Sequence, residues 1–280
     1  VLVSYPMKLQ TRRGMTQRKA KPAAIHPTAV VHPKAHLGKA VSVGPYCVID
    51  AEVEVGDGTE VMNHVTLHGP ITIGRRNRIF PYASLGQDAQ DKKFKPGEPS
   101  ALEIGDENVI REFVTINRGT KGGGSVTRIG HRNWIMAYCH IAHDCQVGSD
   151  TVFANNATLG GHVHIGSAAY LGGFTAVHQF CSVGEMTMTG GHTMIAQDVP
   201  PYVIAAGNRV RLFGVNRIGL ERNGVPPEEI RAIQDAYKLF FRSRLSREAG
   251  LAAIEAKWSA SEHAMRFAEF IRASTRGICR

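Results

Sequence analysis

Large apolar residues recur at every sixth position along most of the chain. The series covers residues 25–85, resumes over 104–116 and continues over 129–195, and of its 26 positions only Thr189 lacks a large apolar side chain. An amphipathic helix needs apolar spacings of three and four, and a half-buried strand needs a spacing of two. Neither element explains a period of six, so the pattern predicts a repeat architecture.

A second restricted position lies four residues after each large apolar one. It is usually small or β-branched, as at Ala29, Val41, Thr59 and Ala157. Short strands that meet at tight corners would place one large and one small side chain of each hexapeptide in a narrow interior, with successive rungs about 4.8 Å apart. The chain also has 30 glycines and only 7% aromatic residues, which we expect tight corners and a thin interior to require.

This repeat resembles that of the hexapeptide-repeat transferases over residues 25–199. The resemblance implies an all-β solenoid, a left-handed parallel β-helix with three hexapeptides per coil. Its handedness is an exception to the usual rule for parallel crossovers. We expect the β-helix to cover residues 24–201, with loops near 86–103 and 119–128, where the six-residue phase breaks.

A helical pattern replaces the six-residue one after residue 201. Two prolines and two glutamates at residues 226–229 form a helix start, and apolar residues then recur with helical spacing to about residue 271. We therefore expect a C-terminal α-helical domain over residues 202–280, which would cover the open end of the β-helix.

Composition and charge narrow the class of protein. The chain of 280 residues is 43% hydrophobic, and no run approaches the roughly 20 apolar residues of a spanning helix, so we expect a soluble, cytoplasmic protein with no stable membrane insertion. Six basic residues and no acidic ones lie in residues 1–23, a leader without the apolar segment of a secretory signal, which we expect to be disordered. Without them the net charge of +9 falls to +3, so we expect no nucleic-acid partner.

Four of the five cysteines occupy the small inward position of the repeat: Cys47, Cys139, Cys145 and Cys181. Cysteine acts as a compact hydrophobic residue in such a place. We therefore expect them to be structural, with no disulfide or metal chemistry. Cys279 lies in the C-terminal tail and supports no prediction.

Residues 18 apart lie directly above one another when each coil contains three hexapeptides. His143 is then in line with Gly161 and Gln179, and one coil earlier the same face carries Asn117 and Arg118. The histidines that gather on this face are His140, His143, His162 and His178. The two loops that interrupt the six-residue phase both leave the coil on this face, so they would border a cleft.

The histidine cluster suits general-base catalysis. Histidine has an ordinary pKa of about 6.5, and the adjacent Asp144 could fix the tautomer of His143 and stabilise its imidazolium. Zinc binding is the alternative, since three histidines hold zinc between subunits of the gamma-class carbonic anhydrases, and His140, His143 and His162 could form such a set. We favour the base and expect neither a metal nor another cofactor.

Five stretches resemble the family of UDP-N-acetylglucosamine O-acyltransferases. They are HIAHDC at residues 140–145, ANNATL at 154–159, TAVHQF at 175–180, QDVPPY at 197–202 and STRG at 274–277. The resemblance implies transfer of a 3-hydroxyacyl chain from acyl carrier protein to the 3-hydroxyl of UDP-N-acetylglucosamine, the first step of lipid A biosynthesis. It also implies a homotrimer with sites between subunits.

The same resemblance implies a role for each matching residue. His143 would be the general base, Asp144 its partner, and the backbone N–H of Gly161 the donor to the oxyanion. The residues that would bind the UDP-sugar and the acyl donor are Asp91, Lys93, His140, His162, His178, Gln179, Gly191, Asn216 and Arg222. Asn216 and Arg222 would come from the helical domain of the adjacent subunit and reach the diphosphate, since a guanidinium matches paired phosphate oxygens.

Three positions depart from the family pattern. Asn117 stands where relatives commonly have histidine, Asn223 where they have a second arginine, and Arg209 where a relative has a histidine near the end of the acyl groove. The length of the acyl chain is therefore left open. The acceptor is left open too, because N-acyltransfer to a 3-amino UDP-sugar would use the same residues.

Overall fold

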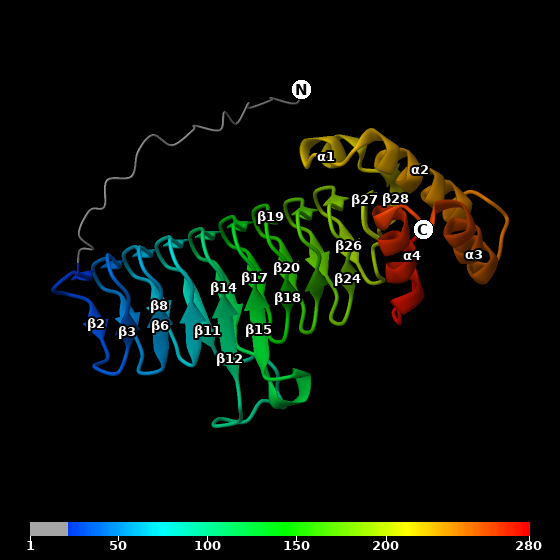
Figure 1. Cartoon of the computed structure of the whole chain (residues 1–280). Helices are drawn as coiled ribbons and strands as arrows, with labels where there is room; N and C mark the ends of the chain where they lie inside the picture. The colour runs from blue at the N-terminus through cyan, green and yellow to red at the C-terminus, as the bar shows by residue number, and fades with distance from the viewer. Residues whose placement is uncertain (1–21) are drawn as a thin grey trace, which may run out of the picture.

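The computed structural model describes residues 22–280, so the leader expected over residues 1–23 lies outside the described part except for its last two residues. The fold is a left-handed parallel β-helix, with helices at its C-terminal end (Figure 1). The predicted fold class is confirmed.

Three sheets form the sides of the β-helix. The first sheet contains β1 (Ala24–Ile25), β4 (Ser42–Val43), β7 (Glu60–Val61), β10 (Arg78–Ile79), β13 (Val109–Ile110), β16 (Trp134–Ile135), β19 (Val152–Phe153), β22 (Tyr170–Leu171), β25 (Met188–Thr189), β27 (Val203–Ala206) and β28 (Arg211–Val215). The second sheet contains β2 (Val30–Val31), β5 (Val48–Ile49), β8 (Thr66–Leu67), β11 (Ser84–Gln87), β14 (Thr115–Asn117), β17 (His140–Ile141), β20 (Thr158–Leu159), β23 (Ala176–Val177) and β26 (Met194–Ile195). The third sheet contains β3 (His36–Leu37), β6 (Val53–Val55), β9 (Ile71–Ile73), β12 (Ala101–Ile104), β15 (Val126–Ile129), β18 (Gln146–Val147), β21 (His164–Ile165) and β24 (Ser182–Val183).

The six-residue repeat fills the interior as its period predicts. Ile79, Leu85 and Ile116 are fully buried, whereas Ile25, in the first coil of the described residues 22–280, is 47% exposed. The one polar member of the series, Thr189, is also fully buried, and its hydroxyl accepts a hydrogen bond from the backbone N–H of Gly172 at 2.9 Å. The four cysteines at the small position are buried and free, as expected.

Glycine serves a different purpose from the one we expected. The left-handed backbone conformation at the corners is adopted mainly by other residues, such as Tyr46 at a φ of 58° and Phe113 at a φ of 58°. Many glycines instead lie where coils approach closely: a Cβ on Gly56 would be 2.6 Å from the carbonyl carbon of Gly74. The aromatic rings at the corners lie outside the helix and stack, with the rings of Phe113 and Tyr138 4.8 Å apart.

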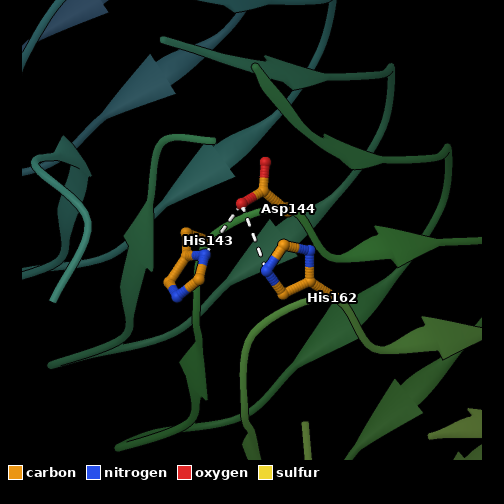
Figure 2. A group of neighbouring side chains, drawn as sticks. All are labelled: His143, Asp144 and His162. Carbon is orange, nitrogen blue, oxygen red and sulfur yellow. Dashed lines mark hydrogen bonds and ion pairs between the residues drawn. The ribbon is translucent and has the colours of Figure 1, made fainter. Parts of the chain in front are cut away.

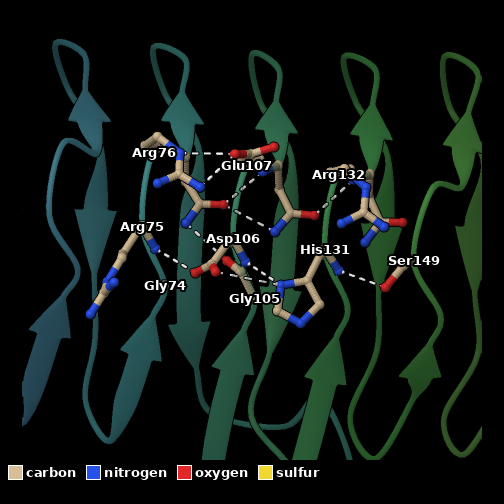
Figure 3. A network of polar contacts seen from close by, with 12 residues as sticks. Gly74, Arg75, Arg76, Gly105, Asp106, Glu107, His131, Arg132 and Ser149 are labelled. Atoms are coloured by element: carbon tan, nitrogen blue, oxygen red, sulfur yellow. Dashed lines mark hydrogen bonds and ion pairs between the residues drawn. The ribbon is translucent and has the colours of Figure 1, made fainter. Parts of the chain in front are cut away.

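Polar contacts join the coils at the corner between the third and first sheets. Figure 3 shows the backbone N–H of Asp106 donating to His131, at 2.9 Å, and that of His131 donating to Ser149, at 3.0 Å. Inside the same corner, Oδ1 of Asn77 accepts from the backbone N–H of Asn108 at 2.8 Å. Such bonds satisfy polar groups that the narrow interior would otherwise leave unpaired.

The C-terminal part contains α1 (Arg217–Arg222), α2 (Pro227–Phe241), α3 (Arg247–Trp258) and α4 (Glu262–Ala273). The helix start expected at residues 226–229 is the beginning of α2, while α1 has no counterpart in the sequence prediction. Ser246 and Ser261 cap α3 and α4 by accepting backbone hydrogen bonds. Between residues 22 and 280 the structure has no helix with the length and apolar character that crossing a bilayer requires.

The first sheet continues beyond residue 201, where we expected only helices. There β27 pairs in parallel with β25, and β28 pairs antiparallel with β27. The end of the chain also returns to the β-helix, because the backbone N–H of Cys279 donates to the carbonyl of Asp198 at 3.0 Å. The C-terminal part is therefore joined to the last coil by strand pairing as well as by helices.

Candidate active site

One corner of the β-helix carries most of the candidate residues. His143 and Asp144 follow β17, Gly161 and His162 follow β20, and Gln179 follows β23, each in the turn from the second sheet to the third. Two long loops, residues 88–100 after β11 and 118–125 after β14, leave from the same corner and project along the lower edge of the molecule in Figure 1. Both are shorter than expected because the flanking strands extend into them.

His143 and Asp144 form a hydrogen-bonded pair. Nδ1 of His143 lies 2.8 Å from Oδ2 of Asp144, and the same oxygen lies 3.8 Å from Nε2 of His162 (Figure 2). The Asp144 side chain is wholly buried, whereas that of His143 is 12% exposed. In this arrangement a carboxylate would keep the proton of a neutral His143 on Nδ1 and leave Nε2 free to accept another.

The Asp144 carboxylate is held from a second direction by the loop of residues 118–125. The backbone N–H and hydroxyl of Thr120 donate to its two oxygens at 2.9 and 2.7 Å. Burial by itself would raise the pKa of Asp144, but the hydrogen bonds from His143 and Thr120 together lower it below the ordinary value. The carboxylate is therefore ionised at neutral pH.

Gly161 lies directly beside the His143 ring. A Cβ at this position would be 2.7 Å from Nε2 of His143, so any other residue would have to displace the ring. Within residues 22–280 the backbone N–H of Gly161 donates no main-chain hydrogen bond. A free N–H next to the imidazole is suited to receive negative charge that develops on a reacting oxygen.

His162 joins the corner to a cavity between the two loops. Its ring stacks on that of Phe180, with centroids 4.4 Å apart. Burial lowers the pKa of His162 and outweighs the negative charge of Asp144, which would raise it. The ring is therefore neutral at neutral pH. The cavity has a volume of about 310 Å³, and the residues around it include Asp91, Lys93, Glu98, Thr120, His162 and Phe180.

His140 and His178 lie near the His143–Asp144 pair, in the coils before and after His162. Nδ1 of His140 is 2.7 Å from the hydroxyl of Thr115, and burial, followed by the charge of His143, lowers the pKa of His140. His178 is exposed, and its Nδ1 is 3.2 Å from the guanidinium of Arg276 near the chain end. The corner therefore includes a basic side chain from the C-terminal tail.

Three candidates lie away from this corner. Gly191 is in a turn from the first sheet to the second, which is a different corner. Asn216 directly precedes α1 and Arg222 ends it, and α1 lies along the upper edge in Figure 1, opposite the long loops. Asn216 caps α1 by accepting from the N–H of Gly219, and its amide donates to the carbonyl of Met186 at 2.9 Å.

Two of the three departures from the family pattern, Asn117 and Asn223, have hydrogen-bond partners. Asn117 is buried and donates to the carbonyl of Asp88 at 2.6 Å, at the start of the first long loop. Arg118 bonds to Gly69 and Asp88, so it also anchors that loop. Asn223 donates to the carbonyl of Gly219 at the end of α1, and Arg209 is exposed between β27 and β28.

The possible metal ligands that lie close together are not the three histidines that the sequence analysis considered as a zinc site. His143, Asp144 and His162 each offer a ligand atom, all within 4.8 Å of one another, and His140 is not in this group. Asp144 already accepts hydrogen bonds from His143 and Thr120, which a metal would have to displace. This chain alone does not assemble the three-histidine set.

Sequence reasoning missed Thr120, Phe180 and Arg276. Phe180 lies 18 residues after His162, so the stacking of coils could have identified it. Thr120 and Arg276 lie in segments outside the repeat, where the coil count gives no position. Their contacts appear only in the folded chain.

Two protein families match this chain, one in the C-terminal part and one in the β-helix. Residues 198–279 match the family described as UDP N-acetylglucosamine O-acyltransferase, domain 2, and residues 127–161 match the bacterial transferase hexapeptide family of six repeats. The relative from Janthinobacterium sp. (strain Marseille), named acyl-(acyl-carrier-protein)–UDP-N-acetylglucosamine O-acyltransferase, is 52% identical over 91% of this chain and 99% of its own length.

Solved structures resemble the fold over the same extent. LpxA from Acinetobacter baumannii has a TM-score of 0.89 at 41% identity, covering 91% of this chain and 99% of that one. The UDP-N-acetylglucosamine acyltransferase from Arabidopsis has a TM-score of 0.81 at 38% identity, covering 91% and 100% of the two chains.

Proposed function

This chain belongs to the UDP-N-acetylglucosamine O-acyltransferase family, and we propose that its acyl transfer takes place at the corner that contains His143. The enzyme moves a 3-hydroxyacyl chain from acyl carrier protein to the 3-hydroxyl of UDP-N-acetylglucosamine, the first step of lipid A biosynthesis. The observation that carries the assignment of the site is the 2.8 Å contact between Nδ1 of His143 and Asp144, which leaves Nε2 available as a base.

His143 starts the reaction by removing a proton from the acceptor. Its Nε2 takes the proton of the sugar 3-hydroxyl while that oxygen attacks the carbonyl carbon of the thioester. The negative charge of Asp144 stabilises the imidazolium that forms, without itself accepting the proton. The buried, ionised state of this carboxylate supports the role.

The carbonyl oxygen becomes an oxyanion in the tetrahedral intermediate. The backbone N–H of Gly161 donates to it, which lowers the energy of the charge that develops. When the carbonyl re-forms, the bond to sulfur breaks and the leaving thiolate takes the proton from His143. The products are the O-acyl sugar nucleotide and the free thiol of the carrier, and His143 is neutral again.

The other corner residues bind the substrates. Asp91, Lys93 and His162 surround the cavity of about 310 Å³, which is suited to the hydroxyl-rich sugar. His140, His178 and Gln179 extend the site along the stacked turns, toward the nucleotide and the acyl donor. Gly191 bounds the acyl chain from the neighbouring corner.

The remaining ligands come from a second subunit. Asn216 and Arg222 lie at the two ends of α1, on the opposite edge of the molecule from the loops that border the corner (Figure 1), which supports their acting at the site of another subunit. A homotrimer would bring α1 of one subunit to the corner of the next. The trimer and the cytoplasmic location stay predictions.

The two alternatives from the sequence are not favoured. The relatives carry the name of O-acyltransferases, and the Asp144 carboxylate beside His143 already accepts hydrogen bonds from His143 and Thr120. Acceptor identity is nonetheless simple to measure. UDP-N-acetylglucosamine should be acylated, and its 3-amino counterpart should be a poor acceptor.

The test is an acyl-transfer assay with purified protein. UDP-N-acetylglucosamine and 3-hydroxyacyl carrier proteins of graded chain length are offered, and the acylated nucleotide is measured. We expect transfer with at least one length, and a loss of about 10²-fold or more in His143→Ala, which is the usual contribution of a general base. No transfer with any donor would refute the function, and turnover by His143→Ala close to that of the wild type would refute the role of the base.

A further inference from the structure

Thr120 binds the Asp144 carboxylate with both of its donors. Its backbone N–H lies 2.9 Å from Oδ1 and its hydroxyl 2.7 Å from Oδ2. Oδ2 is the same oxygen that lies 2.8 Å from Nδ1 of His143. Thr120, in the loop 118–125, and the catalytic His143 therefore both bond to Oδ2 of Asp144.

The carboxylate has little freedom to move in this arrangement. Asp144 is buried, as is Thr120, and the backbone N–H of Asp144 donates to the hydroxyl of Thr127 at 2.8 Å. Gly123 closes the remaining side, because a Cβ there would lie 2.1 Å from the carboxylate carbon. The loop thus packs against the carboxylate as well as bonding to it.

Thr120 is itself held in place by both long loops. Its carbonyl accepts from the backbone N–H groups of Gly123 and Ser125, at 3.0 and 2.8 Å. On either side, the hydroxyl of Ser100 donates to the carbonyl of Gly119 at 2.7 Å, and the N–H of Lys121 donates to Glu98 at 3.1 Å. The position of Thr120 therefore depends on loop residues 88–100 and 118–125 together.

We propose that Thr120 is a positioning residue of the reaction, whose hydroxyl fixes the Asp144 carboxylate so that His143 keeps its proton on Nδ1. The inference rests on the proposed role of His143 as the base. Nε2 can accept the sugar proton only in this tautomer, so loss of the hydroxyl lowers the fraction of competent enzyme. The Thr120 hydroxyl acts through Asp144, because it is already bonded to that carboxylate.

Two substitutions separate this role from a structural one. Thr120→Val keeps the shape and the backbone N–H but removes the hydroxyl donor, and Thr120→Ser restores that donor. Because hydrogen bonds to charged groups are the stronger ones, we expect Thr120→Val to lower kcat about 10- to 100-fold with KM for both substrates nearly unchanged. Thr120→Ser should return kcat to within about threefold of the wild type.

A matched control lies in the same loop. Within residues 22–280 the hydroxyl of Ser125 makes no hydrogen bond, while its backbone contacts Thr120, so Ser125→Ala should keep wild-type kcat. Gly123→Ala offers a second route to the same effect, since its methyl group would displace the carboxylate while Thr120 keeps its hydroxyl. It should also lower kcat.

The direct readout is the tautomer of His143, observed by ¹⁵N NMR of labelled protein. The wild type and Thr120→Ser should show the proton on Nδ1, and Thr120→Val should show a rise in the form with the proton on Nε2. If Thr120→Val keeps both wild-type kcat and tautomer while His143→Ala is inactive, the positioning role is wrong and the reaction stands. If the wild type transfers no acyl chain, the proposed function fails, and the tautomer measurement still decides whether Thr120 orients the pair.

Discussion

Gly161 lies in close contact with the imidazole of His143: a Cβ at residue 161 would be 2.6 Å from Cε1 of that ring. The contact results from coil stacking, because residue 161 lies 18 positions after residue 143 and occupies the equivalent place in the next turn. The absence of a side chain thus leaves room for the His143 ring, which we propose as the base.

Gly161→Ala should abolish most of the activity while leaving the fold intact. The added methyl group must displace the imidazole, and displacement by about 1 Å can cost about 10²-fold in rate. We expect kcat to fall by about that factor with little change in the circular dichroism spectrum. Gly250→Ala is the control, since a Cβ there meets its neighbours at an ordinary 3.5 Å in α3, far from the corner. Equal kcat in the two variants would contradict the tight packing of Gly161 on His143.

His140 should make the folded state sensitive to mild acid. Burial lowers the pKa of His140 below its ordinary value of 6.5, so the folded protein binds this proton less readily than the unfolded chain. The stability associated with the neutral ring is therefore complete above about pH 6.5 and is lost as the pH falls through the lowered pKa. In urea unfolding at pH 8 and pH 5.5, the wild type should lose more free energy of unfolding than His140→Gln. Equal losses would show that His140 is not the group responsible.

Asn108 should be important for stability and unimportant for the chemistry. It is fully buried, its amide donates to Oδ1 of Asn77 at 3.0 Å, and its own Oδ1 accepts from the N–H of Asn133 at 2.9 Å. Asn108→Ala leaves the N–H of Asn133 without an acceptor and removes one of the two donors to Oδ1 of Asn77, so it should reduce the free energy of unfolding by about 1–3 kcal/mol. The exposed Asn155→Ala is the control and should change it by less than about 0.5 kcal/mol. Matching unfolding midpoints for the two variants would be incompatible with the buried network.

The cysteines should be unreactive until the protein unfolds. All five are buried, and burial raises the pKa of Cys139, Cys145 and Cys279 to about 12. Because the thiolate is the reactive form, a disulfide reagent at pH 8 should modify the native protein very slowly. Addition of denaturant should expose all five thiols at once. Rapid modification of even one thiol in the native state would contradict the interior placement.

The sequence alone was sufficient for the fold and for the line of stacked residues. A strict six-residue period predicts a solenoid, and the family resemblance supplied its left-handed coil of three hexapeptides. The resulting count of 18 residues per coil places His143, Gly161 and Gln179 in consecutive turns without knowledge of any contact. The period also predicts which side chains are buried, because each short strand turns the same position inward. Family resemblance added the chemical roles, which periodicity does not contain.

Only the tertiary structure decided what surrounds the base. Thr120 and Arg276 lie in segments with no repeat, so their contacts with Asp144 and His178 depend on how a loop and the chain end fold back onto the corner. The extra strands β27 and β28 were missed for a related reason: they pair with the last coil through backbone hydrogen bonds, which carry no six-residue signal. Repeats are specified by local side-chain patterns, whereas the closing contacts of the site are non-local and exist only once the coils are stacked.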